Sequence, residues 1–437
     1  MKLLNPTVGI YTLGCKVNQY ESEAIAERLS LDGFTVLPPQ EVCDVYIVNT
    51  CTVTGESDRK ARQFIRRAIH QNPTAYVLVT GCFSQTSPEV VAAIEGVDFV
   101  CGNADKQAVV RAAKALVDRG YKNDRAEVLK ESPDAHGFEP MQIRKFDRTR
   151  AYVKIEDGCE NRCSYCIIPT ARGSVRSKSP DDVVAEVSEL VRGGCREVVL
   201  TGIETASYGK DLSDCTLADL LERVDKIPNI GRVRLGSLDP SLMKQPFVDR
   251  IARLRSIAPH FHLSIQSGSD TVLARMRRKY NSRMALDGME RLRRAISNVQ
   301  FTTDVIVGFP QETEEEFVQT LDFVQQAKFL MIHVFPYSRR KGTEADLMSG
   351  QIPESVKHKR IRILSEEQAK IRRSILDGMN GRETEVLFET DGNDFAEGHT
   401  PDFIEVRCKT DAPVHGKTFR VMIARNDGKI CYGKILP

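Results

Sequence analysis

The chain has 437 residues, of which 41% are hydrophobic and 28% are charged, and its formal net charge is only +2. This composition is typical of a soluble globular protein with two or three domains, and it excludes a uniformly basic nucleic-acid-binding protein. No apolar run is long enough for a membrane span, and residues 1–6 lack the apolar core of a signal peptide. We therefore expect a cytoplasmic protein whose twelve cysteines do not form disulfides.

The first part of the chain, residues 1–140, predicts a doubly wound α/β domain. Strand-like runs alternate with helical patterns, as in a parallel sheet. The strand-like runs are 8–13, 45–49, 76–80 and 97–100, and the helical patterns are 19–30, 57–71, 88–94 and 106–118. A polar segment at 122–150 marks the domain boundary, and its part 138–146 is expected to pack as an edge strand.

Three cysteines of this domain follow strand-like runs. Cys15, Cys51 and Cys82, here called the N-terminal triplet, each lie in a turn of small residues. Because ligands bind at the carboxyl edge of an open parallel sheet, we expect the three side chains to converge there. Three thiolates can hold a 4Fe–4S cluster with one open iron. Cys101 also follows a strand, but we interpret it and the other isolated cysteines as small buried side chains.

The central region, residues 141–374, predicts a partial (β/α)6 barrel. Six strand-like runs alternate with helical stretches, and active sites of such barrels lie at the carboxyl ends of the strands. The runs are 151–157, 197–203, 232–238, 260–266, 302–309 and 329–336. The site of this domain is therefore expected where these six strands end.

A second cysteine group follows the first of these strands. Cys159, Cys163 and Cys166, here called the central triplet, have the spacing C-x3-C-x2-C. Three thiolates can hold three irons of a 4Fe–4S cluster and leave the fourth free for a small molecule. The alternative is zinc, which usually takes four ligands in paired C-x2-C knuckles, and the sequence has no second knuckle. Hydrolase elbows and phosphate-binding loops are absent from the sequence.

The central triplet resembles that of the radical S-adenosylmethionine (SAM) superfamily, and the N-terminal motifs are similar to those of its methylthiotransferase family. The stretches that carry the second resemblance are 13–23, 49–54 and 80–82. The resemblance implies two 4Fe–4S clusters. The cluster on the central triplet would bind SAM and release a 5′-deoxyadenosyl radical, and the auxiliary cluster on the N-terminal triplet would handle the sulfur to be inserted.

The resemblance also implies contacts to SAM and to the substrate at the strand ends. The expected cofactor-binding residues are Tyr165, Gly202, Ser237, Asp239, Gln266, Ser267, Ile306 and Gly308. The segment 236–240 departs from the family pattern, because glycine replaces a serine and aspartate replaces a glutamate. Asn18, Arg339 and Arg340 are expected to face the substrate, since a guanidinium can bind a carboxylate or phosphate with two hydrogen bonds.

The last segment, residues 375–437, predicts a small antiparallel β-barrel. Its strand patterns are 384–389, 403–408, 418–423 and 429–435, and glycine and aspartate turns separate them. Its position resembles that of the TRAM domain, an RNA-binding barrel that ends most methylthiotransferases. Gly398 and Gly416 match the glycine turns of that domain, although a barrel that only caps the core gives the same pattern.

The motif 14–21 and the residues 58–63 are similar to one subgroup of the family, which modifies N6-threonylcarbamoyladenosine next to the tRNA anticodon. We therefore expect a tRNA methylthiotransferase that forms the 2-methylthio derivative of this nucleoside. Its expected partners are the anticodon stem-loop and a reduced flavodoxin or ferredoxin-type electron donor, with no membrane, and the chain is expected to act as a monomer. The alternatives are isopentenyl-adenosine in tRNA, an aspartate of a ribosomal protein, or a zinc-stabilised RNA-binding protein without catalysis.

Overall fold

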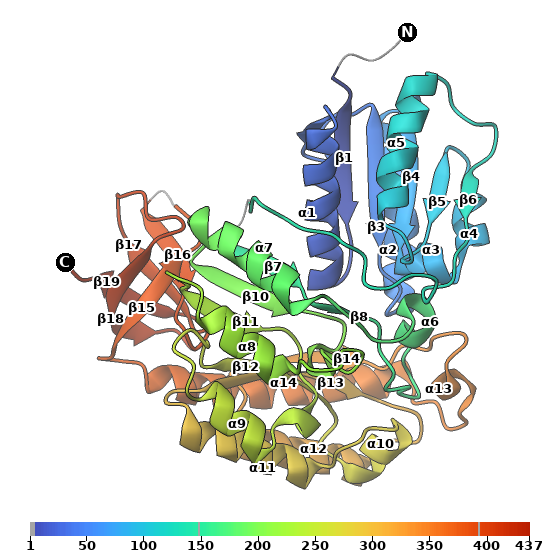
Figure 1. Ribbon diagram of the computed structural model, residues 1–437. Coiled ribbons are helices and arrows are strands. Elements are labelled where there is room, and N and C mark those ends of the chain that lie inside the picture. Colours follow the sequence, from blue (N-terminus) through green and yellow to red (C-terminus); the bar gives the residue numbers. More distant parts are fainter. Residues whose placement is uncertain (1–4, 147–148, 392–393) are drawn as a thin grey trace.

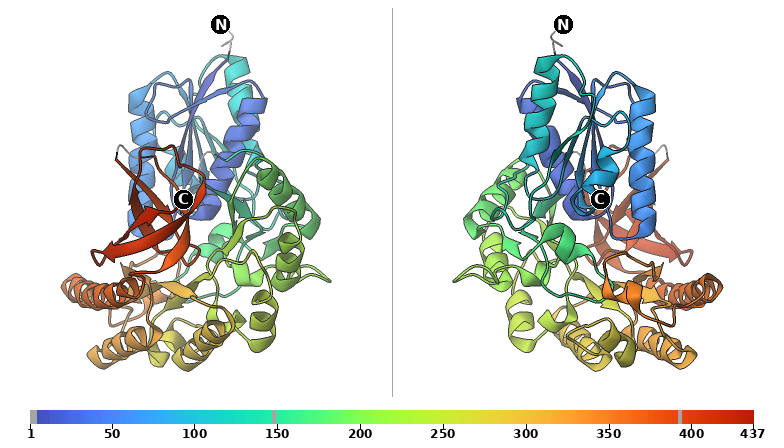
Figure 2. Two further views of the ribbon diagram at one scale, coloured as in Figure 1. Left: turned by 90° about the vertical axis from the view of Figure 1, so that its left-hand side faces the viewer. Right: turned by 90° about the vertical axis from the view of Figure 1, so that its right-hand side faces the viewer.

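The computed structural model describes residues 5–146, 149–391 and 394–437 (Figure 1). Residues 1–4, on which the prediction about a signal peptide partly depends, lie outside the described residues. None of the helices in these ranges is both long enough and apolar enough to span a bilayer. Both views of Figure 2 show an N-terminal sheet that stands on a central partial barrel, with a smaller C-terminal barrel beside it.

A six-stranded parallel sheet forms the N-terminal part, in the order β2-β1-β3-β4-β5-β6. The strands are β1 Thr7–Thr12, β2 Thr35–Leu37, β3 Val45–Thr50, β4 Tyr76–Gly81, β5 Phe99–Cys101 and β6 Glu127–Leu129. β3 and β4 are buried along their whole length, as expected for central strands covered on both faces. The sequence prediction missed β2 and β6, which are three-residue edge strands with mostly exposed side chains.

Helices cover both faces of this sheet, so the predicted doubly wound fold is confirmed. α1 Lys16–Leu31 and α5 Gln107–Arg119 pack on one face. α2 Gly55–Gln71, α3 Cys82–Thr86 and α4 Pro88–Ala92 pack on the other. The strand order reverses direction between β1 and β3, and ligands of open α/β sheets bind beside such a switch point.

The prediction of an edge strand at 138–146 is wrong. No strand forms among these residues, and Met141 and Ile143 are instead buried in the core between the sheet and the central barrel. Side chains of neighbouring helices bind the backbone groups of Met141 and Ile143. The Tyr20 hydroxyl donates to the Met141 carbonyl at 2.6 Å, and the Ile143 amide donates to Glu186 Oε1 at 2.8 Å. The segment therefore serves as packing between two layers.

The central part is the predicted partial barrel of six parallel strands with helices outside (Figure 1). Its strands are β7 Arg150–Lys154, β10 Glu197–Thr201, β11 Arg232–Leu235, β12 His260–Gln266, β13 Gln300–Val307 and β14 Met331–Pro336. They form two parallel sheets of three strands, and a bridge between Leu238 and Leu263 connects the sheets. The helices are α6 Ile168–Arg172, α7 Pro180–Arg192, α8 Leu217–Asp225, α9 Gln245–Ile251, α10 Asp270–Arg275, α11 Ser282–Ala295, α12 Glu314–Ala327, α13 Glu344–Leu347 and α14 Glu354–Asp377. A short antiparallel pair, β8 Glu156–Asp157 and β9 Arg176–Ser177, flanks the loop that carries the central triplet.

The C-terminal part is a closed barrel of five strands in the order β15-β16-β17-β19-β18. The strands are β15 Glu383–Phe388, β16 Phe395–His399, β17 Glu405–Lys409, β18 Thr418–Asn426 and β19 Cys431–Ile435. One pair, β17 with β19, is parallel, which the antiparallel prediction did not include. Gly398 lies inside β16 and not in a turn. Glycine is needed there because an added Cβ would lie 2.2 Å from the Leu387 carbonyl oxygen. Gly416 does form a turn, with φ +71°.

Candidate functional site

The carboxyl edge of the N-terminal sheet carries the N-terminal triplet. Cys15 is the N-cap of α1, Cys51 directly follows β3, and Cys82 begins α3 directly after β4. Gly14 packs against Cys51 so closely that a Cβ on Gly14 would lie 2.9 Å from Cys51 Sγ. Since β1, β3 and β4 are neighbours in the sheet, the three cysteines lie beside the switch point of the strand order.

These thiols also influence one another electrostatically. The pKa of Cys51 is raised to about 11, first by burial and then by the nearby thiols of Cys82 and Cys15. Burial likewise raises the pKa of Cys15, although its side chain is exposed to solvent. The three thiols are therefore close enough to interact, and a metal that binds them displaces their protons.

The loop of the central triplet depends on a glycine and on contacts to α10. Gly158 has φ +85°, and a Cβ there would lie 1.8 Å from the Ser174 carbonyl oxygen, so only glycine fits before Cys159. The Ser164 hydroxyl donates to the Arg275 carbonyl at 2.7 Å, which fixes the middle of the loop. Burial raises the pKa of Cys159 to about 12, with Glu204 and the neighbouring Cys163 as further causes.

An arginine of the loop after α10 contacts the central triplet. Arg278 donates from one terminal nitrogen to Cys163 Sγ at 3.2 Å and from the other to Asp239 Oδ2 at 3.0 Å. Its guanidinium also lies 5.0 Å from the ring centroid of Tyr280. Arg278 therefore connects a cysteine of the triplet with one of the strand-end residues expected to contact SAM.

Two of the expected SAM contacts lie at a crowded or a strained point of the backbone. Gly202 follows β10, and a Cβ there would lie 2.4 Å from Glu156 Oε2, so the strand end has no room for a side chain. Gln266 has φ +65°, in a bulge of β12 against β13. A non-glycine residue in this region is strained, and such strain concentrates at functional sites.

The remaining expected SAM contacts differ in how freely their side chains can reach a ligand. Tyr165 packs edge-on against Phe309 at 6.4 Å between ring centroids. The Ser267 side chain is fully buried, and its hydroxyl lies 3.2 Å from that of Thr320. Asp239 accepts a hydrogen bond from the Ser241 amide. The others are the half-buried Ser237 and Ile306, and Gly308, whose amide donates to Glu312 Oε2 at 2.6 Å.

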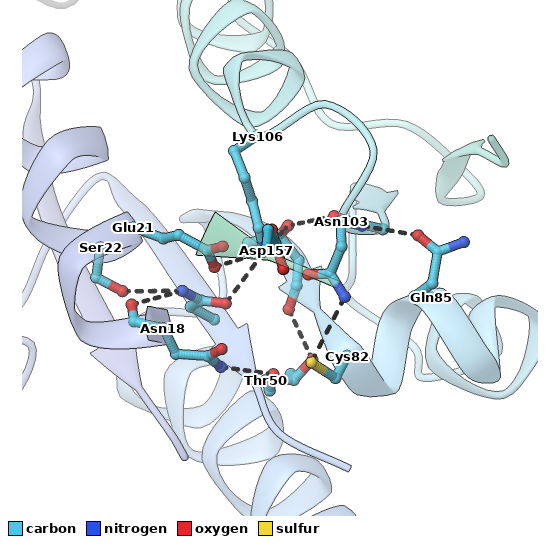
Figure 3. A network of polar contacts seen from close by, with 12 residues as sticks. Asn18, Glu21, Ser22, Thr50, Cys82, Gln85, Asn103, Lys106 and Asp157 are labelled. Atoms are coloured by element: carbon cyan, nitrogen blue, oxygen red, sulfur yellow. Dashed lines mark hydrogen bonds and ion pairs between the residues drawn. The ribbon is translucent and has the colours of Figure 1, made fainter. Parts of the chain in front are cut away.

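A buried polar network surrounds Cys82 of the N-terminal triplet (Figure 3). Arg172 ends α6, which begins two residues after Cys166, and the residue has no exposed surface. Its Nε lies 3.3 Å from Cys82 Sγ, and one terminal nitrogen donates to Asn18 Oδ1 at 2.6 Å. Asn103 donates to Cys82 Sγ at 3.5 Å and also to the Ala171 carbonyl at 2.8 Å. Cys82 of the N-terminal triplet is thus in contact with the end of the helix that follows the central triplet in the chain.

Ion pairs surround this junction. Glu21 of α1 pairs with Arg172 at 2.5 Å, with Lys154 at 2.9 Å and with Lys106 at 3.3 Å. Asp157 pairs with Lys154 at 2.6 Å. The three cations hold the pKa of Glu21 well below its usual range against the opposing effect of its complete burial. All five side chains are buried, so the N-terminal sheet and the central barrel are held in one relative position at this point.

Comparison with known proteins identifies the family. Two family models match the chain: the radical SAM superfamily over residues 153–324 and the uncharacterized protein family UPF0004 over residues 7–102. The threonylcarbamoyladenosine tRNA methylthiotransferase MtaB of Bacillus subtilis (strain 168) is 40% identical over 428 residues, which cover 96% of this chain and 94% of that protein. This chain belongs to the radical SAM methylthiotransferase family. A tRNA-2-methylthio-N(6)-dimethylallyladenosine synthase of Carboxydothermus hydrogenoformans is 35% identical over 387 residues, which cover 87% of this chain and 87% of that protein.

A solved structure supports the fold of this methylthiotransferase. The radical SAM methyltransferase TsrM from Kitasatospora setae, with cobalamin and a 4Fe–4S cluster bound, is similar with a TM-score of 0.58. The similarity covers 79% of this chain and 77% of that one at 15% identity. At this identity the comparison concerns the fold alone, which agrees with the α/β sheet and barrel described above.

Membership of the radical SAM methylthiotransferases implies a 4Fe–4S cluster and SAM, and the residues at the central triplet fit both. Cys159 and Cys166 are partly exposed, and Arg278 supplies an N–H donor to Cys163 Sγ, as is common around cluster sulfurs. Within the ranges that the structure describes, no three His, Cys, Asp or Glu side chains are grouped to hold a single metal ion.

The structure shows where the three expected substrate residues of the methylthiotransferase lie. Asn18 is buried in the network, where its side-chain amide donates to the Leu13 and Thr50 carbonyls. Arg340 is largely buried and binds Asp58 and Thr52 of the N-terminal part, next to Cys51. Arg339 is exposed and binds Asp346 at 2.9 Å. The two arginines therefore have different roles. Arg340 connects the central barrel with the N-terminal sheet, and Arg339 lies at the surface.

A row of polar side chains on the barrel strands interacts electrostatically with Lys16, the residue after Cys15. His262 Nε2 lies 3.3 Å from Asp304 Oδ2, and Asp304 pairs in register with His333. Lys16, next to Cys15, is exposed, but its pKa is lowered by desolvation and by cations of the barrel strands, foremost Arg234. Lys16 also contributes to lowering the pKa of His333, after desolvation and His262. This row is accessible and polar.

Sequence reasoning missed the residues that connect the two sites. Arg172, Arg278 and Asn103 each donate to a cysteine sulfur, yet none was predicted as a site residue. Arg172 lies six residues after Cys166, and this short distance from the central triplet is a signal by which the sequence could have indicated it as a site residue. Arg278 and Asn103 lie far from the triplets that they contact, so only the fold brings them there.

Proposed function

We propose that this protein converts N6-threonylcarbamoyladenosine next to the tRNA anticodon to its 2-methylthio derivative. The observation that supports this proposal is that Arg172 and Asn103, which both donate to Cys82 of the N-terminal triplet, are fixed at the end of the short helix that begins two residues after the central triplet. Methylthio transfer needs a radical source and a sulfur source at one substrate, and two adjacent triplets provide a place for both.

In this proposal the N-terminal triplet holds a second 4Fe–4S cluster, in addition to the cluster that the family implies at the central triplet. When bound, the two groups supply one-electron cleavage of SAM and the sulfur that is transferred. The chain's own residues orient them. Arg278 donates to Cys163 of the central triplet, and Arg172 donates to Cys82 of the N-terminal triplet. The strand ends near Gly202 and Gln266 would bind SAM.

Two features support the threonylcarbamoyl nucleoside as the substrate. The relative named for this substrate is 40% identical, against 35% for the relative named for the dimethylallyl substrate. The threonylcarbamoyl group carries a carboxylate and a hydroxyl, whereas a dimethylallyl group is apolar. The accessible polar row with Lys16, His262 and His333 suits the first group and not the second.

The proposal also assigns a role to each of the three domains and names the partners of the protein. The N-terminal sheet (1–140) would carry the auxiliary cluster, the partial barrel (141–374) the radical chemistry, and the C-terminal barrel (375–437) the contact with the anticodon stem-loop. The structural support for the last assignment is a small closed β-barrel, a type of fold that binds RNA through its strand faces and loops. A flavodoxin or ferredoxin-type donor would supply electrons to a cytoplasmic monomer.

Cluster analysis and product analysis test the proposal. Protein reconstituted without oxygen should contain about eight irons per chain, from two four-iron clusters. Cys163→Ala should lose reductive SAM cleavage and keep one cluster. Cys51→Ala should keep SAM cleavage and lose the methylthio product. Methylthiolation at the wild-type rate by the Cys51 variant would contradict the role of the N-terminal triplet.

Substrate choice is tested with anticodon stem-loops that carry either threonylcarbamoyladenosine or isopentenyl-adenosine. Nucleoside mass spectrometry should detect the methylthio product only from the first. Lys16→Met should raise KM for that stem-loop about tenfold, the effect of losing one charge-assisted hydrogen bond, and should leave SAM cleavage unchanged. Lys244→Met, at an exposed position before α9, is the matched control. Product from the isopentenyl stem-loop alone would favour the second substrate.

A further inference from the structure

Arg172 contacts the N-terminal triplet from the end of the short helix that follows the central triplet in the chain. Cys166 closes the central triplet, and α6, which ends at Arg172, begins two residues after it. At the other end, Arg172 Nε lies 3.3 Å from Cys82 Sγ. The side chain has no exposed surface, so water does not compete for this contact.

Cys82 receives a second N–H donor from Asn103, whose Nδ2 lies 3.5 Å from the sulfur. The same amide group donates to the Ala171 carbonyl at 2.8 Å, directly before Arg172. The Asn103 backbone is held in turn, because its amide donates to Gln85 Oε1 at 2.7 Å (Figure 3). Both donors to Cys82 are therefore attached to the same helix end.

The Arg172 guanidinium cannot turn away from Cys82 without breaking other bonds. One terminal nitrogen binds Glu21 at 2.5 Å and Asp157 at 3.1 Å, and the other donates to Asn18 Oδ1 at 2.6 Å. Charge-assisted bonds of this kind are the strong ones, and the planar fork of arginine fits them in one orientation only. The N–H that faces Cys82 is thus fixed in place by anions on two layers of the molecule.

Donors to a cysteine ligand change the electronic properties of an iron–sulfur cluster. Hydrogen bonds to the sulfurs and the charge around the cluster are two of the factors that set its reduction potential. A reduced cluster carries one more negative charge than an oxidised one. A fixed cation with its N–H directed at the ligand sulfur therefore favours the reduced form.

We propose that Arg172 is a positioning residue that holds the Cys82 thiolate and raises the reduction potential of the auxiliary cluster. This inference rests on the proposed function, because it presumes that the N-terminal triplet holds a cluster. Through α6, the same residue sets the position of that cluster relative to the central triplet.

The test uses full-length protein in which Cys159, Cys163 and Cys166 are all replaced by alanine, so that only the N-terminal triplet remains. After anaerobic reconstitution it should hold about four irons, and a potentiometric titration followed by electron paramagnetic resonance gives the midpoint potential. Arg172→Lys keeps the charge but loses the Nε–H donor, and Asn103→Leu removes the other donor and keeps every ion pair. Both should move the midpoint to more negative values. Arg278→Lys, which changes the arginine at Cys163, is the matched control and should leave it unchanged.

Unchanged midpoints in both Arg172→Lys and Asn103→Leu would overturn the inference. If the Arg172 variant does not retain the cluster, Asn103→Leu alone decides, because it leaves the buried ion pairs intact. A protein without iron before either substitution is introduced counts against the auxiliary cluster itself, and so separates failure of the proposed function from failure of the role of Arg172.

Discussion

At the scale of single residues, the junction between the N-terminal sheet and the central barrel contains ionised side chains without solvent contact. Arg172, Glu21 and Lys106 are all 0% exposed. Buried ion pairs contribute little net stability compared with apolar packing, but removal of one partner costs about 3–5 kcal/mol. Such a network therefore selects one relative position of two layers more than it strengthens them. Here that position places Cys82 beside α6.

Glu139, close to this network, gives a prediction about pH. Burial raises its pKa to about 7, although Lys154 opposes the shift. Its Oε1 accepts a hydrogen bond from the Gln107 amide at 2.9 Å, and its buried Oε2 has no partner among the residues that the structure describes. The folded state therefore binds a proton more tightly than the unfolded state, and stability falls as pH rises from about 4.5 to 7.

Glu139→Gln should remove this loss of stability. The variant should exceed the wild type by about 2 kcal/mol at pH 8, and the difference should shrink towards zero near pH 4.5. Because the chain has no tryptophan, urea unfolding is best followed by circular dichroism at both pH values. Glu95→Gln, which changes an exposed carboxylate, is the control. An equal difference at pH 8 and pH 4.5 would contradict the assignment to a titrating Glu139.

At the scale of elements, the turns after β3 and β4 determine where the N-terminal triplet lies. Gly81 ends β4 with φ +106°, and a Cβ there would lie 2.3 Å from the Thr50 carbonyl oxygen. The absence of a side chain lets the end of β4 approach that of β3, which brings Cys82 close to Cys51. The position of the cysteine thus depends on the backbone of the neighbouring strand.

Gly81→Ala should displace Cys82 and lower the iron content of the N-terminal triplet by at least half, in protein that lacks the central triplet. The matched control is Gly33→Ala, since Gly33 has a similar φ of +91° but no atom within 4 Å of an added Cβ. That variant should lose about 1 kcal/mol of stability and keep its iron. Equal iron in the two variants would show that the close approach of β4 to β3 is not needed for cluster binding.

The elements that bear the cysteines could be predicted from the sequence because their signals are local. β3 and β4 are continuous apolar runs, and the rule that ligands gather at the carboxyl edge of a parallel sheet placed Cys15, Cys51 and Cys82 together. β2 and β6 could not be predicted, since three exposed residues carry no periodic pattern.

The ion network could not be predicted either. Glu21, Lys106 and Arg172 are far apart in sequence, and each resembles an ordinary surface charge until the layers pack together. Phe403 shows the same limit in the small barrel. The sequence suggests a strand from Phe403 onward, but this residue has φ +70°, and β17 begins only at Glu405. Its conformation is set by contacts with the central barrel.

At the scale of the whole molecule, Phe403 attaches the C-terminal barrel to the amino-terminal side of the central strands. Its ring stacks between those of His260 and His399, at 4.5 and 4.8 Å between centroids. The guanidinium groups of Arg234 and Arg150 lie 4.8 and 5.4 Å from the ring centroid. The small barrel is thus held at the end of the strands opposite to the central triplet, by Phe403 together with polar contacts such as those of Arg150 with Glu389 and of Arg234 with the Pro401 carbonyl.

Phe403→Ala should loosen the C-terminal barrel without altering the chemistry at the triplets. Loss of the stacking and cation–π contacts should cost about 2 kcal/mol and increase amide hydrogen exchange in residues 383–435. Reductive SAM cleavage should continue at the wild-type rate, because the central triplet lies at the other end of the strands. Phe395→Ala is the matched control, since Phe395 belongs to the same barrel and is 45% exposed. If both variants exchange alike, the attachment does not depend on Phe403.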